Sequence, residues 1–175
     1  MENKNIFLIG FMGSGKSALA RIIAKQTKRA LIEMDETIEA EAGITINQIF
    51  ETYGEAYFRD LETGLISRIV QKGNCIVSCG GGTVLREENV KYMRSNGVIV
   101  YLSATPETIY ARVRNSTNRP LLNGNMNVEY IRELMGKRQP IYENAADVVI
   151  DVNGKEKHEI VNEILECKEW IDKEY

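Results

Sequence analysis

Near its start the chain reads Gly10-Phe11-Met12-Gly13-Ser14-Gly15-Lys16-Ser17, which matches the pattern G-x-x-x-x-G-K-[ST] in full. The apolar run 6–9 precedes this stretch, and the helical pattern of residues 18–23 follows it. A phosphate-binding loop needs that context, because it must follow a strand and open a helix. Its backbone N–H groups then surround phosphate oxygens, and the helix N-terminus adds partial positive charge. The stretch predicts a nucleoside triphosphate site.

The rest of the chain alternates short apolar runs with helical patterns, and no internal repeat or linker interrupts it. Most of the runs are apolar throughout, which is typical of parallel strands covered on both faces. The predicted strands are 5–9, 30–32, 75–79, 97–102 and 147–152. The predicted helices are 17–27, 45–70 with a break near Gly54, 86–94, 105–113, 128–138 and 155–170. This order predicts one three-layer α/β domain over residues 1–175, with helices on both faces of a parallel sheet.

Composition and charge exclude several functional classes. The chain has 175 residues, a net charge of −3 and 27% charged residues, so there is no basic surface for nucleic acid. No apolar run approaches the roughly 20 residues that span a bilayer. The polar residues 1–4 lead directly into a predicted strand, so we expect no signal peptide. We therefore expect a cytoplasmic protein that binds neither membrane nor nucleic acid.

Cysteine and histidine do not indicate chemistry in this chain. Cys75 and Cys79 lie four residues apart on one predicted strand, about 13 Å from each other and too far for a disulfide. We expect buried thiols in a reducing compartment. His158 is the single histidine, and we expect it on the surface of a charged C-terminal helix.

Segments after the phosphate loop argue against a GTPase and against a large ATPase. No N-K-x-D segment is present to read guanine, and the third strand does not end in the Asp that follows an apolar run in large ATPases. The third strand instead runs into Gly80-Gly81-Gly82. Glycines at the carboxyl end of a parallel strand let a ligand approach the backbone at the edge where α/β sheets bind ligands.

The second strand is predicted to end in two carboxylates, Glu33 and Asp35. Residues two apart share one face of a strand, so both could face the phosphate loop. One could organise Mg²⁺ through its waters, while the other takes a proton from a substrate hydroxyl. Acidic residues also commonly open a following helix, and that alternative stays open for Asp35.

Three arginines complete the candidate site, since guanidinium groups match carboxylate and phosphate geometry. Arg59 lies in the predicted helical stretch 45–70, Arg119 in a polar loop and Arg138 near the end of a helix. The loop covers residues 114–127 and is long and polar, so we expect a lid.

In their order and spacing these segments resemble the shikimate kinases along almost the whole chain. The matching segments are the phosphate loop, the carboxylate pair ending in Asp35, Phe58-Arg59 with Glu62, Gly80-Gly81-Gly82, Arg119-Pro120-Leu121-Leu122 and Lys137-Arg138. The resemblance implies a P-loop kinase of the nucleoside-monophosphate-kinase-like fold, with strand order 2-3-1-4-5. It also implies phosphorylation of the 3-hydroxyl of shikimate by ATP and Mg²⁺ in aromatic amino-acid biosynthesis. We expect the protein to be a monomer.

The resemblance also assigns roles. Lys16, Asp35 and Arg119 are implied as catalytic, with Asp35 at the reacting hydroxyl and Arg119 closing from the lid. Residues implied to bind ATP are Gly13, Ser14, Gly15, Lys16, Ser17, Ala18, Arg112 beside the adenine, and Arg119. Residues implied to bind shikimate are Asp35, Arg59, Gly80, Gly81, Gly82 and Arg138, within an acceptor-binding helical region at 36–70. From the phosphate-loop pattern itself we expect Ser17 to ligate Mg²⁺, and from the geometry of that ion we expect Glu33 to act through its water.

Two positions depart from the family pattern, which usually has Asp where this chain has Glu33 and Thr where it has Ala18. Two other functions are alternatives to shikimate phosphorylation. A gluconate kinase or related small-molecule kinase would handle a neutral polyol and would not need two guanidinium groups. A regulatory protein that holds ATP without turnover could lack Asp35 or Arg119, and this chain has both.

Overall fold

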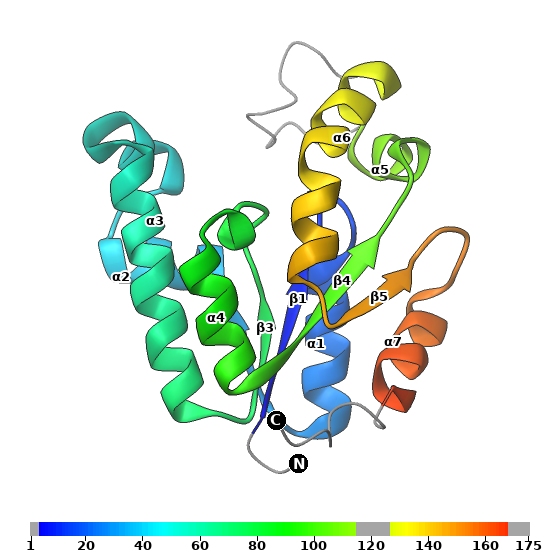
Figure 1. Ribbon diagram of the computed structural model, residues 1–175, viewed down its shortest axis with the longest axis horizontal. Helices are drawn as coiled ribbons and strands as arrows, with labels where there is room; N and C mark the ends of the chain where they lie inside the picture. The colour runs from blue at the N-terminus through cyan, green and yellow to red at the C-terminus, as the bar shows by residue number, and fades with distance from the viewer. Residues whose placement is uncertain (1–3, 115–126, 168–175) are drawn as a thin grey trace.

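The computed structural model describes residues 4–114 and 127–167 (Figure 1). Its elements are β1 (Asn5–Ile9), α1 (Lys16–Thr27), β2 (Ala30–Glu33), α2 (Met34–Ala42), α3 (Ile46–Lys72), β3 (Cys75–Ser78), the 3₁₀ helix η1 (Thr83–Leu85), α4 (Glu87–Ser95), β4 (Gly97–Ser103), α5 (Pro106–Val113), α6 (Val128–Ala145), β5 (Val148–Asp151) and α7 (Lys157–Glu166). The alternation predicted from the sequence is confirmed.

The five strands form one sheet in the order β2-β3-β1-β4-β5, and every neighbouring pair is parallel. The predicted strand order is therefore correct. β1 lies in the middle, so the loop after it, residues 10–15, emerges at the centre of the carboxyl edge. The ends of β2 and β3 are beside it, because Glu33 is in register with Ser78, and Ser78 with Leu8.

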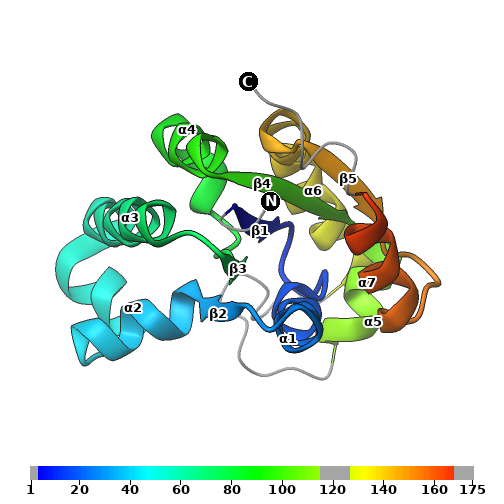
Figure 2. The same cartoon turned by 90° about the horizontal axis from the view of Figure 1, so that it is seen from below.

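Successive residues of the three central strands β3, β1 and β4 enter different cores, which explains why these strands are apolar throughout. Phe7 and Ile9 pack with Val77 on the face covered by α2 to α6. Ile6 and Leu8 pack on the opposite face, under α1 and α7. Seen from below, in Figure 2, α1 and α7 lie on one side of the sheet and α4 and α6 on the other.

A helix begins before Asp35, sooner than the predicted pair of carboxylates on one strand requires. β2 ends at Glu33 and α2 begins at Met34, so Asp35 lies in the first turn of a helix. The prediction that Glu33 and Asp35 share one face of a strand is therefore wrong, and the alternative of a helix start is correct. A carboxylate in the first helical turn is favoured by the helix dipole. The helix α2 was not predicted as a separate element.

The helix α6 continues beyond the predicted end at Arg138 and through Pro140 to Ala145. Proline lacks the N–H that would bond the carbonyl four residues earlier, and this usually ends a helix. Here the last turn is held by packing, because Tyr142 and Ala145 are both buried in the core. Tertiary burial thus outweighs the local preference.

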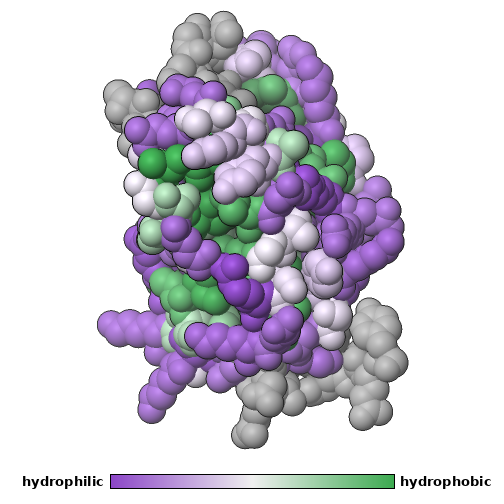
Figure 3. Space-filling view, turned by 90° about the vertical axis from the view of Figure 1, so that its left-hand side faces the viewer, coloured by the Kyte–Doolittle hydropathy of each residue, from purple (hydrophilic) through white to green (hydrophobic). Residues whose placement is uncertain are grey.

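On the left of Figure 1, α2 and α3 project from the sheet. α3 is interrupted at Gly54, whose backbone is not helical (φ 84°, ψ 171°), as the predicted break near this residue required. Figure 3 faces this side and shows hydrophobic side chains exposed between hydrophilic ones. Within the described ranges, no helix is long and apolar enough to cross a membrane.

Candidate functional site

The loop between β1 and α1 has the conformation that its glycines allow. Gly13 (φ 78°) and Gly15 (φ 105°) are both left-handed, and Gly15 caps α1. A Cβ atom on Gly13 would lie 2.6 Å from Val113 of α5, so a larger residue would also collide with the core. The loop and the start of α1 form the concave, N–H-rich surface that binds phosphate groups.

Lys16 closes the loop on itself. Its Nζ donates to the carbonyls of Gly10 (2.8 Å) and Phe11 (3.1 Å). The ammonium group therefore lies at the mouth of the loop. There it could donate to the oxygens of a bound phosphate as well as to these two carbonyls. The arrangement supplies a fixed positive charge next to the bound phosphates.

Arg112 contacts the outside of the same loop. Its guanidinium group donates to the carbonyls of Gly13 (3.3 Å) and Ser14 (3.0 Å), and to Val152 after β5 (3.3 Å). A peptide group is planar and trans, so holding a carbonyl outward directs the following N–H inward. Arg112 thus supports the phosphate-binding shape of the loop, while its predicted place beside the adenine stays a prediction.

Asp35 lies beside the glycine turn that follows β3. A Cβ atom on Gly80 would be 2.8 Å from the Asp35 carboxylate and 2.9 Å from that of Glu62, so only glycine leaves room for both. Asp35 keeps access to solvent. Loss of water around the carboxylate, then the negative charge of Glu62, raise the pKa of Asp35, and the charge of Lys16 opposes them. A carboxylate of raised pKa close to the phosphate loop is suited to act as a general base.

Arg59 is fixed by its neighbours on α3. Nη1 donates to the fully buried Glu62 at 2.6 Å, and Nη2 to the exposed Glu55 at 3.1 Å. Glu62 also accepts a hydrogen bond from Thr83 of η1 at 2.7 Å. Burial alone would lower the pKa of Arg59, but the hydrogen bonds and charges of these two glutamates outweigh it and raise the pKa. Arg59 is a permanent, oriented cation.

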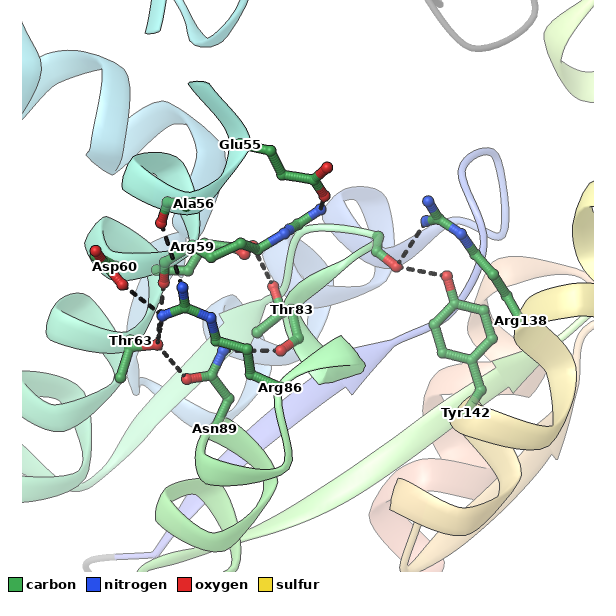
Figure 4. Close-up of polar contacts among 12 residues, drawn as sticks. Glu55, Ala56, Arg59, Asp60, Thr63, Thr83, Arg86, Asn89, Arg138 and Tyr142 are labelled. Carbon is green, nitrogen blue, oxygen red and sulfur yellow. Dashed lines mark hydrogen bonds and ion pairs between the residues drawn. The ribbon is translucent and has the colours of Figure 1, made fainter. Parts of the chain in front are cut away.

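The glycine turn separates Arg59 from Arg138, which comes from α6. A Cβ atom on Gly82 would lie 2.4 Å from Nη2 of Arg59. Arg138 donates from Nη1 to the carbonyl of Gly81 at 3.2 Å. Figure 4 shows the two guanidinium groups pointing toward the same space from opposite sides of the turn. Two cations that converge in this way match the two oxygens of a carboxylate.

A hydroxyl group suited to a magnesium ion lies at the start of α1. The Ser17 Oγ is 3.2 Å from the Ser78 Oγ at the end of β3. Hydroxyl and carboxylate oxygens, with phosphate oxygens and water, are the ligands Mg²⁺ takes. Glu33, next to Ser78 in the register, is instead paired with Nε of Arg21 at 3.1 Å. These residues fit an ion held by Ser17, with Glu33 in a supporting position.

Comparison with known proteins agrees with this geometry. The sequence profile of the family described as shikimate kinase matches residues 12–169. The chain belongs to the shikimate kinase family. It is 42% identical over 162 residues to the shikimate kinase of Thermodesulfovibrio yellowstonii, covering 93% of each chain. A shikimate kinase of Dehalococcoides mccartyi is 40% identical over 165 residues, 94% of this chain and 93% of that protein.

Comparison with solved structures also identifies shikimate kinases. The shikimate kinase of Acinetobacter baumannii, determined in complex with shikimate, superposes with a TM-score of 0.88 at 30% identity, over 98% of this chain and 96% of that one. A gluconokinase of Sinorhizobium meliloti superposes with a TM-score of 0.57 at 19% identity, over 94% of this chain and 91% of that one. The second likeness shows a shared fold alone. Membership of the shikimate kinase family makes the chain an ATP-dependent small-molecule kinase.

Two contacts within the candidate site were not predicted from the sequence. Glu62, which was named only as part of the segment with Phe58-Arg59, binds Arg59, and Tyr142 binds the carbonyl of Gly81. Both could have been found by helical spacing, because Glu62 is three residues after Arg59 and Tyr142 four after Arg138. Ser78 carries no such signal, since only strand register brings it to Ser17.

The remaining predicted residues are Arg119 and the lid, Ala18, the two cysteines and the histidine. Arg119 and residues 115–126 of the expected lid lie outside the described residues. Ala18 follows Ser17 in α1 and presents only a methyl group. Cys75 and Cys79 are free and buried, and His158 is exposed on α7, as predicted.

Proposed function

We propose that this chain transfers the γ-phosphoryl group of ATP to the 3-hydroxyl of shikimate, giving shikimate 3-phosphate and ADP. The observation that supports this most directly is the pairing of Arg59 and Arg138 around the glycine turn, next to Asp35. An acceptor with one carboxylate and several hydroxyls would place the carboxylate between the guanidinium groups. A hydroxyl could then reach Asp35 and the phosphate loop.

Each residue has a distinct part in the proposed reaction. Asp35 accepts the proton of the acceptor hydroxyl as the new O–P bond forms, and the bond to ADP breaks in line. Lys16 and the backbone N–H groups of the loop stabilise the charge on the phosphate oxygens. We propose that Arg119 contributes a further cation from a lid at 114–127. The protein is proposed to act as a cytoplasmic monomer.

Magnesium is proposed as the accompanying ion, held through the hydroxyl of Ser17. When bound, it would neutralise phosphate charge. Ser17 and Ser78 keep this point of the sheet edge lined by oxygens. Glu33 would act on the ion's water shell, since its carboxylate is already paired with Arg21.

The first test is turnover. Purified protein should produce ADP from MgATP rapidly with shikimate, and only slowly without it or with gluconate. A gluconate kinase would show the reverse preference, and a nucleotide-holding regulator would bind ATP without acceptor-dependent turnover. Mass spectrometry of the product should show one added phosphate. Absence of shikimate-dependent ADP release from folded, ATP-binding protein would contradict the proposal.

The two arginines should control acceptor affinity. Arg59→Ala and Arg138→Ala are each expected to raise the KM for shikimate, with a smaller effect on that for ATP. Loss of one charge-assisted hydrogen bond costs about 1.5–3 kcal/mol, or roughly ten- to 150-fold in affinity. Calorimetric titration with shikimate checks the affinity directly. Arg68→Ala removes an exposed arginine of α3 that pairs with Glu41 and should bind normally. Normal binding by both site variants would disprove the acceptor site.

Glu33 should affect the metal requirement alone. Glu33→Ala is expected to raise the Mg²⁺ concentration for half-maximal rate, because the water shell loses a hydrogen-bond acceptor. Glu33→Asp should be nearly neutral, and shikimate binding without nucleotide should not change. Arg21→Gln is the matched control, since it removes the partner of Glu33 but leaves the carboxylate. Superimposable Mg²⁺ titrations of wild type and Glu33→Ala would show that Glu33 has no metal role.

A further inference from the structure

The glycine segment after β3 is a β-turn with a distinct central peptide. The carbonyl of Gly80 accepts a hydrogen bond from the N–H of Thr83 at 3.2 Å, which makes Gly81 and Gly82 the two central residues. Gly82 has φ −107° and ψ 1°, as the third residue of a type I turn does. The closing bond does not involve the peptide group between Gly81 and Gly82.

That peptide group can adopt two orientations. Type I and type II turns differ mainly by a half-rotation of the central peptide, and type II requires positive φ at the third position. Glycine at position 82 admits both forms at little steric cost. Because the peptide is planar, its orientation sets the direction of the Gly81 carbonyl and of the Gly82 N–H together. The turn alone therefore does not specify which group faces the acceptor.

Tyr142 supplies the missing constraint. Its hydroxyl donates to the Gly81 carbonyl at 2.6 Å, while Arg138, one helical turn earlier on α6, donates to the same oxygen at 3.2 Å. Tyr142 is 2% exposed, and its ring stacks on that of Tyr101, with ring centroids 5.2 Å apart. Phenylalanine would fill this space equally well. Burial raises the pKa of Tyr142, so the phenol remains protonated and donates at neutral pH.

We propose that Tyr142 is a positioning residue of the acceptor site, whose hydroxyl holds the peptide between Gly81 and Gly82 in one orientation. This inference rests on the proposed function for its effect on the acceptor. When a carboxylate arrives, Arg138 turns from the Gly81 carbonyl to the ligand. Tyr142 keeps that carbonyl bonded, so Arg138 can leave without cost to the turn. In the absence of the hydroxyl, the acceptor must compete with the carbonyl for Arg138, or the peptide rotates.

Tyr142→Phe tests this with two readouts. We expect the KM for shikimate to rise roughly three- to tenfold, the size of one neutral hydrogen bond, with kcat and the KM for ATP nearly unchanged. In the ligand-free protein, the amide NMR signal of Gly82 should shift or broaden, because its peptide is no longer held in one orientation.

Tyr101→Phe is the matched control. Tyr101 is equally buried and belongs to the same stacked pair, but no hydrogen bond joins it to the turn. It should leave the Gly82 signal and the shikimate KM unchanged. An unchanged Gly82 signal and KM in Tyr142→Phe, or equal changes in both variants, would overturn the proposal. Should wild type fail to phosphorylate shikimate, the proposed function fails, while the ligand-free NMR comparison still decides whether Tyr142 holds the turn.

Discussion

Asp35→Asn is expected to lower kcat by about 10²- to 10⁴-fold, the contribution of a positioned general base. Asparagine keeps the size of the side chain in the space that Gly80 leaves, but it cannot accept the proton. Because its surroundings raise the pKa of Asp35, wild-type kcat should fall as the pH is lowered through that pKa. The residual rate of the variant should lack this fall. Single-turnover assays at a series of pH values from neutral downward measure both effects.

Stability provides the control for Asp35→Asn. A carboxylate with a folded-state pKa above its unfolded value binds more protons when folded, so stability decreases as the pH rises through that pKa. The amide removes this loss, together with the repulsion from Glu62. The ligand-free variant should therefore melt no lower than wild type at neutral pH. Low activity accompanied by a lower melting temperature would indicate damage to the fold instead of loss of the base.

Lys16→Met is expected to cost 10²-fold or more in kcat, comparable to the loss of one donor that stabilises charge in the transition state. The methionine retains an unbranched chain but no charge, and it cannot bond the carbonyls of Gly10 and Phe11. Phosphoryl transfer depends on position and charge, so turnover should fall more than shikimate affinity.

Lys25→Met is the matched control for Lys16→Met, because Lys25 lies exposed in the last turn of the same helix. It should retain full activity. Near-normal turnover by Lys16→Met, with circular dichroism unchanged, would contradict the role of this lysine.

Much of the fold could be predicted because its signals are local. The fully apolar runs indicated strands covered on both faces, and the phosphate loop located β1 and α1. The strand order came from resemblance to a family, since strand pairing is not a local property. The end of α6 was placed too early, because Pro140 is a local signal while the burial of Tyr142 depends on the assembled core.

In the candidate site, too, local signals were predictable from the sequence and contacts made by the assembled fold were not. Residues in motifs, such as Lys16 and Arg59, could be named from the sequence. Their partners could be named only where helical spacing reveals them, as with Glu62. The ion pair between Arg21 and Glu33 depends on how α1 packs beside β2, and this packing cannot be predicted from a sequence pattern.

The tight approach of Arg59 to Gly82 has a consequence for inheritance. The atoms nearest to a methyl group at position 82 would be those at the flexible end of Arg59, so the backbone could stay in place while the guanidinium group left Glu62. Selection for folding would therefore tolerate alanine there, and selection for a carboxylate-bearing substrate would not. Among relatives, glycine at 82 and arginine at 59 should be kept together and lost together. In a lineage that changed to a neutral substrate, neither residue would be needed to bind a carboxylate, and both could be replaced. The residues at positions 59 and 82 should therefore indicate whether an ancestral enzyme bound a carboxylate-bearing substrate.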